Sequence, residues 1–454
     1  MMWLSQIAQW TGGALHRDDL KVNAVATDTR DIEPGCLFAA LRGERFDAHD
    51  FLASAKNGGA IAALVEHEQD CFDNVVQVAD SRKGLGRLAG GYAAQFGMPR
   101  LAVTGNAGKT TVKEMAATML GEGTLATNGN FNNDVGVPLT LLRLRAEHRY
   151  AVIELGANAP GEIAWTSSLT RPQVVLVTNV TGAHLEGFGS MQGIADAKAE
   201  IFTGCTQGGQ AIVNNDDSFA DFFAEKARAA GLTVVRVSMD ESTRAGADLY
   251  AENIVLHRDS AEFVLQPLGD AVLVPLPGAH QVSNALMACA AVRALGASLP
   301  QVLPRLAALK PVPGRMHIQS AGTGTVVDDT YNANPGSVRA AIDWLAAQPA
   351  PQMLVLGEMG ELGPQADSLV EALGEYAQQA GIAGLVVMTG AAAAARGYGE
   401  AANIAKDYQQ AANWSAPVLE QGGTVLVKGS RSAGMEAVVR LLATQEHTLT
   451  QGAR

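Results

Sequence analysis

The chain has 454 residues, 47% of them hydrophobic and 17% charged, and its formal net charge at pH 7 is −13. This length exceeds what one hydrophobic core usually serves, so about three domains are expected, and the composition excludes a disordered chain. The negative charge also argues against non-specific binding of nucleic acid.

Cysteines and apolar stretches indicate the compartment. Cys36, Cys71, Cys205 and Cys289 are scattered, so reduced thiols are expected rather than disulfides. The N-terminal run MMWLSQIAQWTGG lacks the basic start of a signal peptide, and no stretch approaches the roughly 20 apolar residues of a membrane-spanning helix. We therefore expect a cytoplasmic protein without membrane insertion.

The first 80 residues predict a small α/β domain, with helices at 4–8 and 51–57 and strands at 22–26, 36–41 and 61–65. Its polar residues gather in two turns, one at Thr29 and Arg30 and one over 42–49. Turns rich in arginine and hydroxyl groups suit a diphosphate or a sugar. A solvated turn is the alternative, and the residues alone do not choose between them.

The run Leu101 to Thr111, LAVTGNAGKTT, predicts a phosphate loop between a strand and a helix. Gly105 and Gly108 allow successive backbone N–H groups to face one point. Lys109 would then reach the β- and γ-phosphates, and the Thr110 hydroxyl would bind Mg²⁺. The spacing GxxGKT is two residues shorter than the usual loop, and an ordinary glycine turn is the alternative.

Strands at 150–155 and 174–179, with a helix at 163–169 between them, predict a doubly wound, mostly parallel sheet whose ligands bind at the carboxyl ends of the strands. Glu154 ends the first strand and could share Mg²⁺ with Thr110. His184 follows the second strand, where a structural hydrogen-bonded histidine is the alternative. Lys198 lies in a helical run, and its pattern alone indicates a solvated surface lysine.

Alternating residues from 249 to 274 predict a small antiparallel sheet, followed by a helix that begins near His280 and contains Asn284. The prolines and glycine of 309–314 predict a linker. Strands at 325–328, 353–356, 385–388 and 425–427 then alternate with helices at 336–347, 366–380 and 434–444. This is a second dinucleotide-fold-like domain. Its paired Asp328 and Asp329 could bind ribose, a metal or an amine, or cap a turn.

Taken together, TGNAGKTT, NGNFNNDVGVP, ELGANAPGEI, TNVTGAHLEGFGS, AKAEIF, PGRM, DDTYNANP, LGEMGELG and VLVKGSRS resemble the Mur ligase family over essentially the whole chain. NNDVGVP and DDTYNANP are most similar to the member that joins D-alanyl-D-alanine to UDP-N-acetylmuramoyl-tripeptide. The resemblance implies an α/β protein of three domains: a UDP-substrate domain over 1–82, a P-loop ATPase-like domain over 83–311 and a Rossmann-like ligase domain over 312–454.

The resemblance also implies ATP and two Mg²⁺ ions as cofactors, with Lys198 carbamylated so that it can bind metal. The implied catalytic residues are Lys109, Glu154, His184 and Lys198, and the implied metal ligands are Thr110, Glu154, His184 and Lys198. The implied nucleotide-binding residues are Gly105, Asn106, Ala107, Gly108, Lys109, Thr110, Thr111, Asn284, Arg315 and Asp329. The implied substrate-binding residues are Thr29, Arg30, Arg42, Gly43, Phe46, Asp47, His49, Asn130, Asn132, Asn133, Asn332, Asn334, Lys428, Ser430 and Arg431.

The implied reaction uses ATP to phosphorylate the tripeptide carboxylate, after which the amine of D-alanyl-D-alanine attacks the acyl phosphate. The enzyme is expected to act as a monomer.

Three alternative functions remain open. A sister ligase that adds the third amino acid would carry a DNPR-like stretch where TYNANP stands. A folylpolyglutamate synthase-like enzyme shares the nucleotide chemistry. A P-loop switch protein would need no third catalytic domain, and the guanine-reading NKxD motif does not occur.

Overall fold

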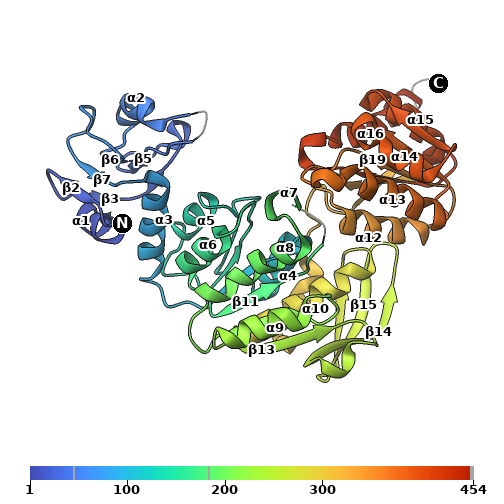
Figure 1. Cartoon of the computed structure of the whole chain (residues 1–454), viewed down its shortest axis with the longest axis horizontal. Helices are drawn as coiled ribbons and strands as arrows, with labels where there is room; N and C mark the ends of the chain where they lie inside the picture. The colour runs from blue at the N-terminus through green and yellow to red at the C-terminus, as the bar shows by residue number, and fades with distance from the viewer. Residues whose placement is uncertain (44–45, 182–184, 450–454) are drawn as a thin grey trace.

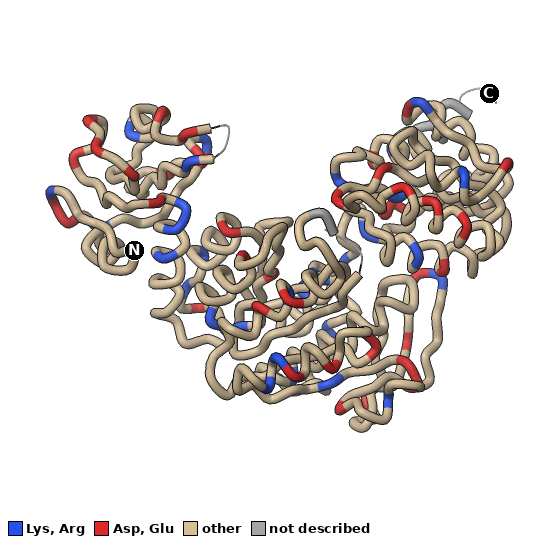
Figure 2. Tube along the Cα trace, in the orientation of Figure 1, with Lys and Arg blue, Asp and Glu red and all other residues tan. Residues whose placement is uncertain are grey.

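The computed structural model describes residues 1–43, 46–181 and 185–449, and of 185–186 and 444–449 it describes the backbone alone. The N-terminal and C-terminal domains stand on either side of a larger central domain (Figure 1). Acidic and basic residues are intermingled along all three domains (Figure 2).

The N-terminal domain has a five-stranded sheet in the order β2-β7-β6-β5-β4 and a separate two-stranded sheet, β1-β3. The elements are β1 (Met2–Trp3), α1 (Leu4–Thr11), β2 (Ala14–His16), β3 (Lys21–Val22), β4 (Val25–Ala26), β5 (Leu37–Ala39), α2 (Leu52–Asn57), β6 (Ala62–Val65) and β7 (Val75–Gln77). The prediction of one strand over 22–26 is wrong, because the chain bends at Asn23, whose Nδ2 donates to Pro34 O at 2.8 Å. The two halves of that run therefore join different sheets.

The central domain is built on a nine-stranded sheet in the order β16-β15-β14-β13-β12-β11-β8-β10-β9. Its strands are β8 (Arg100–Thr104), β9 (Thr124–Ala126), β10 (Tyr150–Glu154), β11 (Val174–Val177), β12 (Gln210–Asn214), β13 (Thr233–Ser238), β14 (Leu249–Leu256), β15 (Ala261–Gln266) and β16 (Asp270–Val274). Strands β8 to β14 run parallel, which confirms the prediction for β8, β10 and β11 and adds β9, β12, β13 and β14 to the parallel part of the sheet. The antiparallel pairing within 249–274 is confirmed, but these strands extend the main sheet through β14 rather than form a sheet of their own.

Helices cover both faces of this sheet. They are α3 (Ser81–Ala93), α4 (Lys109–Leu120), α5 (Gly136–Leu141), α6 (Glu162–Thr170), α7 (Leu185–Phe188), α8 (Met191–Ala199), α9 (Ala220–Ala229), α10 (Ala279–Ala294) and α11 (Leu299–Val302). Alternate residues of β8 enter opposite cores: Ala102 packs toward α3, whereas Leu101 and Val103 pack toward α4 and α10. Because β8 lies between β10 and β11, the connections diverge at its carboxyl end, where α/β sheets bind ligands.

The C-terminal domain has a six-stranded sheet in the order β17-β18-β22-β19-β20-β21, with only β17 antiparallel to its neighbour. Its strands are β17 (His317–Ala321), β18 (Gly324–Asp329), β19 (Gln352–Leu356), β20 (Gly384–Met388), β21 (Ala402–Ala405) and β22 (Thr424–Lys428). Its helices are α12 (Pro335–Ala346), α13 (Ala366–Gln379), α14 (Ala392–Tyr398), α15 (Tyr408–Glu420) and α16 (Glu436–Leu449). The predicted strands and helices of this domain are confirmed; β17, β21, α14 and α15 are additions.

The four cysteines have free thiols, and Cys36 and Cys289 are buried. Within the described parts of the chain, no individual helix has the length and apolar character to cross a membrane; α10 together with the segment Leu299–Ala308 meets that test only as a pair bent by 118°.

Candidate active site at the phosphate loop

The phosphate loop joins β8 to α4, and two glycines set its shape. Gly105 and Gly108 have φ angles of +140° and +81°, which residues with a Cβ rarely adopt. A Cβ on Gly108 would also come within 2.5 Å of Asn284 Oδ1 on α10. Helix α4 begins directly after the loop, at Lys109, so its free N-terminal N–H groups adjoin the loop. The local structure is therefore that of an anion-binding turn.

The residues that follow β11 hold this loop from the neighbouring strand. Ala107 N donates to Asn179 Oδ1 at 2.9 Å, and Asn106 N donates to Asn179 O at 3.1 Å. Thr178 Oγ1 in turn donates to Ala107 O at 2.6 Å. Asn179 is thus a site residue that the sequence analysis left without a role. The signal that could have found it is a polar pair directly after a buried parallel strand, beside the phosphate loop.

Lys109 folds over its own loop, where its Nζ donates to Gly105 O at 2.7 Å and to Asn106 O at 3.2 Å. Burial lowers the pKa of Lys109, the carboxylate of Glu154 opposes this, and the guanidinium of Arg315 adds to it. The ammonium group therefore lies where it can meet the phosphate oxygens of a nucleotide.

Glu154 is the carboxylate of the site, and it is only 2% exposed. Its Oε2 accepts a hydrogen bond from Thr110 Oγ1 at 2.8 Å, and its Oε1 accepts one from Asn132 Nδ2 at 2.8 Å. Arg315, from beyond the linker, donates from Nη2 to Thr110 Oγ1 at 2.9 Å. These contacts offset the cost of burying the carboxylate and bring two of the four predicted metal ligands, Thr110 and Glu154, into contact.

This donor set fits a hard divalent cation, because hydroxyl and carboxylate oxygens are the protein ligands that Mg²⁺ prefers. Across residues 1–43, 46–181 and 185–449, no group of three or more His, Cys, Asp or Glu gathers to form a denser metal site. A site with few carboxylates suits Mg²⁺, which keeps several waters and binds phosphate oxygens. Of the two remaining predicted ligands, His184 lies outside the described residues.

Lys198, near the end of α8, is only 1% exposed, so the expectation of a solvated surface lysine is wrong. Burial is the main cause that lowers its pKa to about 7; Lys109 lowers it further, while Glu200 and Glu162 raise it. The ammonium nitrogen lies 5.6 Å from the ring centroid of Phe188. A lysine with this pKa is partly neutral near pH 7, and the neutral amine is the form that adds to CO₂.

The three asparagines of one loop, Asn130, Asn132 and Asn133, make different contacts. Asn132 reaches Glu154, as described, whereas Asn133 Oδ1 accepts from Gly136 N at 2.8 Å and so holds the start of α5. Asn130 is exposed and accepts a backbone hydrogen bond from Asn132 N at 2.7 Å. Of the three, only Asn132 contacts the carboxylate of the site.

Comparison with known proteins supports this arrangement in all three domains. Residues 21–99 match the Mur ligase family catalytic domain, residues 103–292 the Mur ligase middle domain, and residues 314–431 the Mur ligase glutamate ligase domain. The UDP-N-acetylmuramoyl-tripeptide–D-alanyl-D-alanine ligase of Escherichia coli K12 is 46% identical over 448 residues, which cover 97% of this chain and 98% of that protein. The chain belongs to the Mur ligase family.

Solved structures agree with this assignment. A crystal structure of MurF from Acinetobacter baumannii superposes with a TM-score of 0.91 at 36% identity and covers 96% of this chain and 98% of that one. MurF ligase from Thermotoga maritima in complex with ADP superposes with a TM-score of 0.83 at 27% identity and covers 94% and 99%. The three-domain α/β architecture is therefore confirmed.

In this Mur ligase, a pocket adjoins the phosphate loop between α4, α10 and the linker. Its lining residues are Thr111 and Glu114 of α4, Gln281 of α10, and Leu276, Leu309, Lys310, Val312 and Arg315. Asn284 is buried beside it, and its Nδ2 donates to Gln281 Oε1 at 3.0 Å.

Arg315 and Asp329 were both expected near the adenine and ribose, and the structure brings their segments together, because Met316 N donates to Asp329 Oδ1 at 3.2 Å. The guanidinium carbon of Arg315 lies 4.2 Å from the ring centroid of Tyr331, and Nη2 reaches Thr110 on the phosphate side. The other carboxylate oxygen of Asp329 pairs with Lys428, an expected dipeptide-side residue, at 2.5 Å. Both members of this pair are buried. The ends of β18 and β22 thus form one charged centre in the C-terminal domain.

The remaining candidates of the C-terminal domain have local partners. Asn334 Oδ1 accepts from Ser337 N at 2.9 Å and caps α12, and Asn332 Oδ1 accepts from Ala333 N at 2.9 Å. Ser430 Oγ lies 3.1 Å from Ser432 Oγ. Exposed Arg431 lies 3.6 Å from Glu436. Asn334 therefore has a structural role that its sequence pattern also predicts.

Thr29 and Arg30 begin a short turn in the N-terminal domain. The Arg30 guanidinium pairs with Asp28 at 2.5 Å, and this contact, with the Arg30 backbone N–H, lowers the pKa of Asp28 to about 2. The Arg30 side chain is 86% exposed. It is therefore held near the surface by a neighbouring residue and is open to solvent.

Of the 42–49 loop, residues 44–45 lie outside the described parts of the chain. Arg42 and His49 both contact Asp47, at 3.7 and 2.6 Å, and hydrogen bonds from His49 are the main cause that lowers the pKa of this carboxyl. The other ring nitrogen of His49 accepts from Glu66 N at 3.0 Å, so this histidine orients the loop. Gly43 N donates to Phe46 O at 2.8 Å, and the Phe46 ring is exposed.

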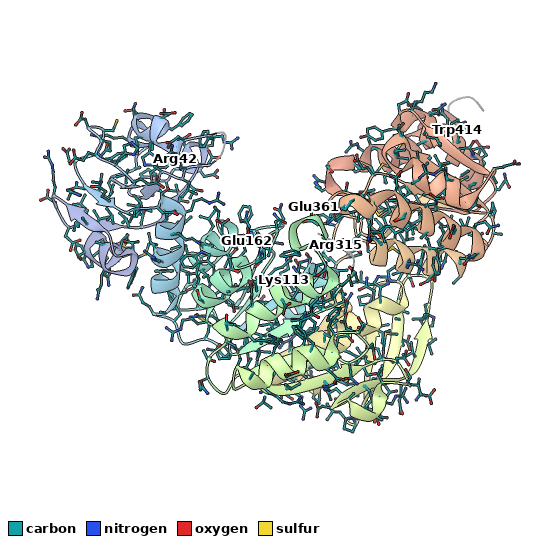
Figure 3. The ribbon with its side chains drawn as sticks, in the orientation of Figure 1. Arg42, Lys113, Glu162, Arg315, Glu361 and Trp414 are labelled. Atoms are coloured by element: carbon teal, nitrogen blue, oxygen red, sulfur yellow. The ribbon has the colours of Figure 1, made fainter. Side chains whose placement is uncertain are left out.

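Figure 3 shows Arg42 in the N-terminal domain, well apart from Arg315 at the phosphate loop. The structure therefore groups the predicted residues into three sets rather than one. Thr110, Glu154, Asn132 and Arg315 meet at the phosphate loop, whereas the candidate residues of the 29–49 and 428–431 segments lie on the flanking domains.

Proposed function

We propose that this chain is an ATP-dependent ligase that joins D-alanyl-D-alanine to UDP-N-acetylmuramoyl-tripeptide and so makes the UDP-N-acetylmuramoyl-pentapeptide precursor of peptidoglycan. The observation that carries the proposal is the contact of Thr110 with buried Glu154 beside a phosphate loop, met by Arg315 from beyond the linker. The name of the 46% identical relative supports the choice of substrates.

Each of the three domains binds a different reactant. Residues 1–82 bind the UDP end of the long substrate, residues 83–311 bind ATP, and residues 312–454 bring the incoming dipeptide. The family matches, which fall within 21–99, 103–292 and 314–431, support this division. All three functions lie on one chain, so a monomer suffices.

The chemistry follows from the poor reactivity of a carboxylate. The terminal carboxylate of the tripeptide takes the γ-phosphoryl group of ATP, and ADP leaves. The amine of D-alanyl-D-alanine then attacks the acyl carbon, loses a proton, and expels inorganic phosphate as the amide forms. Lys109 and the N–H groups of the phosphate loop offset the negative charge of the reacting phosphate. Closure of the C-terminal domain would exclude water that could hydrolyse the acyl phosphate.

Mg²⁺ would be held by Thr110 and Glu154, and a second ion by His184 and carbamylated Lys198. When bound, these ions would supply the positive charge that lets the anionic reactants approach one another. Asn132 keeps the Glu154 carboxylate oriented. The lowered pKa of Lys198 supports its carbamylation, because CO₂ adds to the neutral amine.

We also place the enzyme in the cytoplasm, without membrane insertion and without a nucleic-acid partner. The free thiols and the net charge of −13 support this. ATP and a UDP-linked substrate are consistent with the same location.

Mass spectrometry of the product from UDP-tripeptide, ATP, Mg²⁺ and D-alanyl-D-alanine tests the function, with diaminopimelate and lysine forms of the tripeptide run in parallel. We expect the mass of substrate plus dipeptide less one water, and phosphate release only when both substrates are present. A sister ligase would instead extend the UDP-dipeptide with a single amino acid. A P-loop switch would release phosphate regardless of either compound, and either of these outcomes would overturn the proposal.

A further inference from the structure

Helix α4 carries a second buried lysine, Lys113, one turn after Lys109. Its side chain is 1% exposed, and its neighbours Val112 and Met115 belong to the apolar core. Its Nζ donates to Thr127 O at 2.7 Å and pairs with Glu114 at 2.6 Å. Because burying a charged group costs several kcal/mol unless its partners compensate, an apolar residue would fill this position more cheaply. Packing alone therefore does not explain why a lysine that donates to Thr127 occupies this buried position.

Thr127 is the residue at which β9 gives way to the asparagine-rich loop, and it is 1% exposed. Its backbone N donates to Val152 O at 3.1 Å, and its Oγ1 accepts from Glu154 N at 3.0 Å. Thr127 thus fixes the backbone of the residue whose carboxylate forms the candidate metal site. Lys113 occupies the carbonyl of Thr127 and so ties this residue to α4.

These hydrogen bonds form a closed network around Glu154. Thr110, three residues before Lys113 on the same helix, donates to the Glu154 carboxylate at 2.8 Å. Helix α4 consequently holds Glu154 in two ways: directly at its side chain through Thr110, and at its backbone through Lys113 and Thr127. The loop after Thr127 returns to the same carboxylate through Asn132.

We propose that Lys113 is a positioning residue for the magnesium site, which fixes Glu154 relative to Thr110 and the phosphate loop by way of Thr127. This rests on the proposed function, in which Mg²⁺ accompanies ATP. Figure 3 shows Lys113 and Arg315 in the same part of the molecule, although Lys113 reaches the site only through other residues. Such supporting residues typically change metal affinity or activity by about 10- to 100-fold.

Lys113→Met tests the proposal, because methionine fills a similar volume without a donor. We expect the Mg²⁺ concentration for half-maximal activity to rise about tenfold. Binding of Mn²⁺ in the presence of ADP, followed by electron paramagnetic resonance, should weaken by about the same factor. The KM for D-alanyl-D-alanine should stay unchanged, because the proposed function assigns the dipeptide to the C-terminal domain. Lys113→Arg retains a donor and should recover part of the loss.

Arg305→Met is the matched control. Arg305 Nη1 donates to Met119 O at 3.0 Å and to Leu120 O at 3.1 Å, so a cation again holds backbone carbonyls of α4, here from an exposed residue at the end of the helix away from the phosphate loop. We expect Arg305→Met to lower thermal stability and to leave the affinity for Mn²⁺ unchanged.

Thr127→Val provides an independent arm, because valine keeps the shape of threonine and removes the acceptor for Glu154 N. Thr127→Val should also weaken Mn²⁺ binding. The double variant should bind Mn²⁺ no more weakly than the more affected of the two single variants. If Lys113→Met fails to fold, Lys113→Arg is compared with the unmodified enzyme and should bind Mn²⁺ more weakly. Unchanged Mn²⁺ affinity in the folded variants would overturn the role of Lys113. Lack of ligase activity in the unmodified enzyme would count instead against the proposed function.

Discussion

The phosphate-loop site and the expected UDP site would both bind phosphate groups, yet their charged residues have different surroundings. In the central domain Glu154 is 2% exposed and Lys198 is 1% exposed. In the N-terminal domain the side chains of Arg30 and Arg42 are 86% and 69% exposed. Each of these arginines pairs with an aspartate near it in sequence, Asp28 or Asp47.

The difference in exposure determines how firmly the charged side chains of each site are held. Buried charges interact strongly because little water screens them, and each must be matched by a fixed partner. Exposed ion pairs contribute little and exchange readily with a ligand. We therefore expect substitutions in the central site to impair turnover, and substitutions in the N-terminal site to change the affinity for the UDP substrate.

The largest effect is expected from Lys109→Ala. Removal of the ammonium group takes away the cation that lies over the phosphate loop, so ligation should fall by at least about 10³-fold. Formation of the pentapeptide product measures this. Lys226→Ala, which removes a lysine that contacts Phe222 on exposed α9, should retain full activity. Substantial ligation by Lys109→Ala would contradict the expectation that the buried charges of the central site support turnover.

Lys198→Ala should reduce turnover by about 10²-fold, and short carboxylates such as acetate or formate should restore part of it. The reason is that a carbamate is a carboxylate-like metal ligand, which a small anion can replace in the space left by the side chain. Steady-state rates over a series of acetate concentrations, with chloride at equal ionic strength as control, measure this. Equal rates in both salts would contradict the carbamate.

The pKa of Lys198 also predicts how stability changes with pH. The folded-state pKa of about 7 lies below the usual value of 10.5, so between these values the unfolded chain binds the additional proton and stability rises with pH. Relative to Lys198→Met, the unmodified protein should gain about 2 kcal/mol in free energy of unfolding from pH 7 to pH 9. Urea unfolding in CO₂-free buffer measures this. A constant difference between the two proteins would show that Lys198 is not desolvated.

Arg42→Ala should have the smallest effect, an increase of about tenfold in the KM for the UDP substrate with kcat unchanged. Arg17→Ala is a suitable control, because Arg17 also forms an exposed ion pair with an aspartate, Asp73, in the same domain. A fall in kcat for Arg42→Ala would mean that the UDP site takes part in the chemistry, and the contrast between the two sites would then fail.

Local patterns predict much of the fold. Continuous apolar runs identified β10 and β11, and the prolines and glycine of 309–314 identified the linker. The run 22–26 misled because its two halves pair with different strands, a choice that depends on distant residues. The same is true of 249–274, whose antiparallel strands join the main sheet at an edge that sequence alone does not reveal.

The site shows the same limit. The phosphate loop and Glu154 could be predicted because each stands at the end of a recognisable strand. The burial of Lys198 could not, because a helical pattern does not reveal which neighbouring elements cover it. Lys113 and Thr127 were missed for a related reason: their contact spans 14 residues and two elements. The UDP and dipeptide residues stay predictions.

Arg315 has a consequence for domain exchange between relatives. It lies beyond the prolines of the linker, within the segment that matches the third family domain, yet its guanidinium reaches Thr110 of the second. A chimaera cut in the linker would therefore combine the hydroxyl of one parent with the guanidinium of the other. Such hybrids should be viable only where the donor provides an arginine at this position, so the boundary that looks simplest in sequence divides a shared contact.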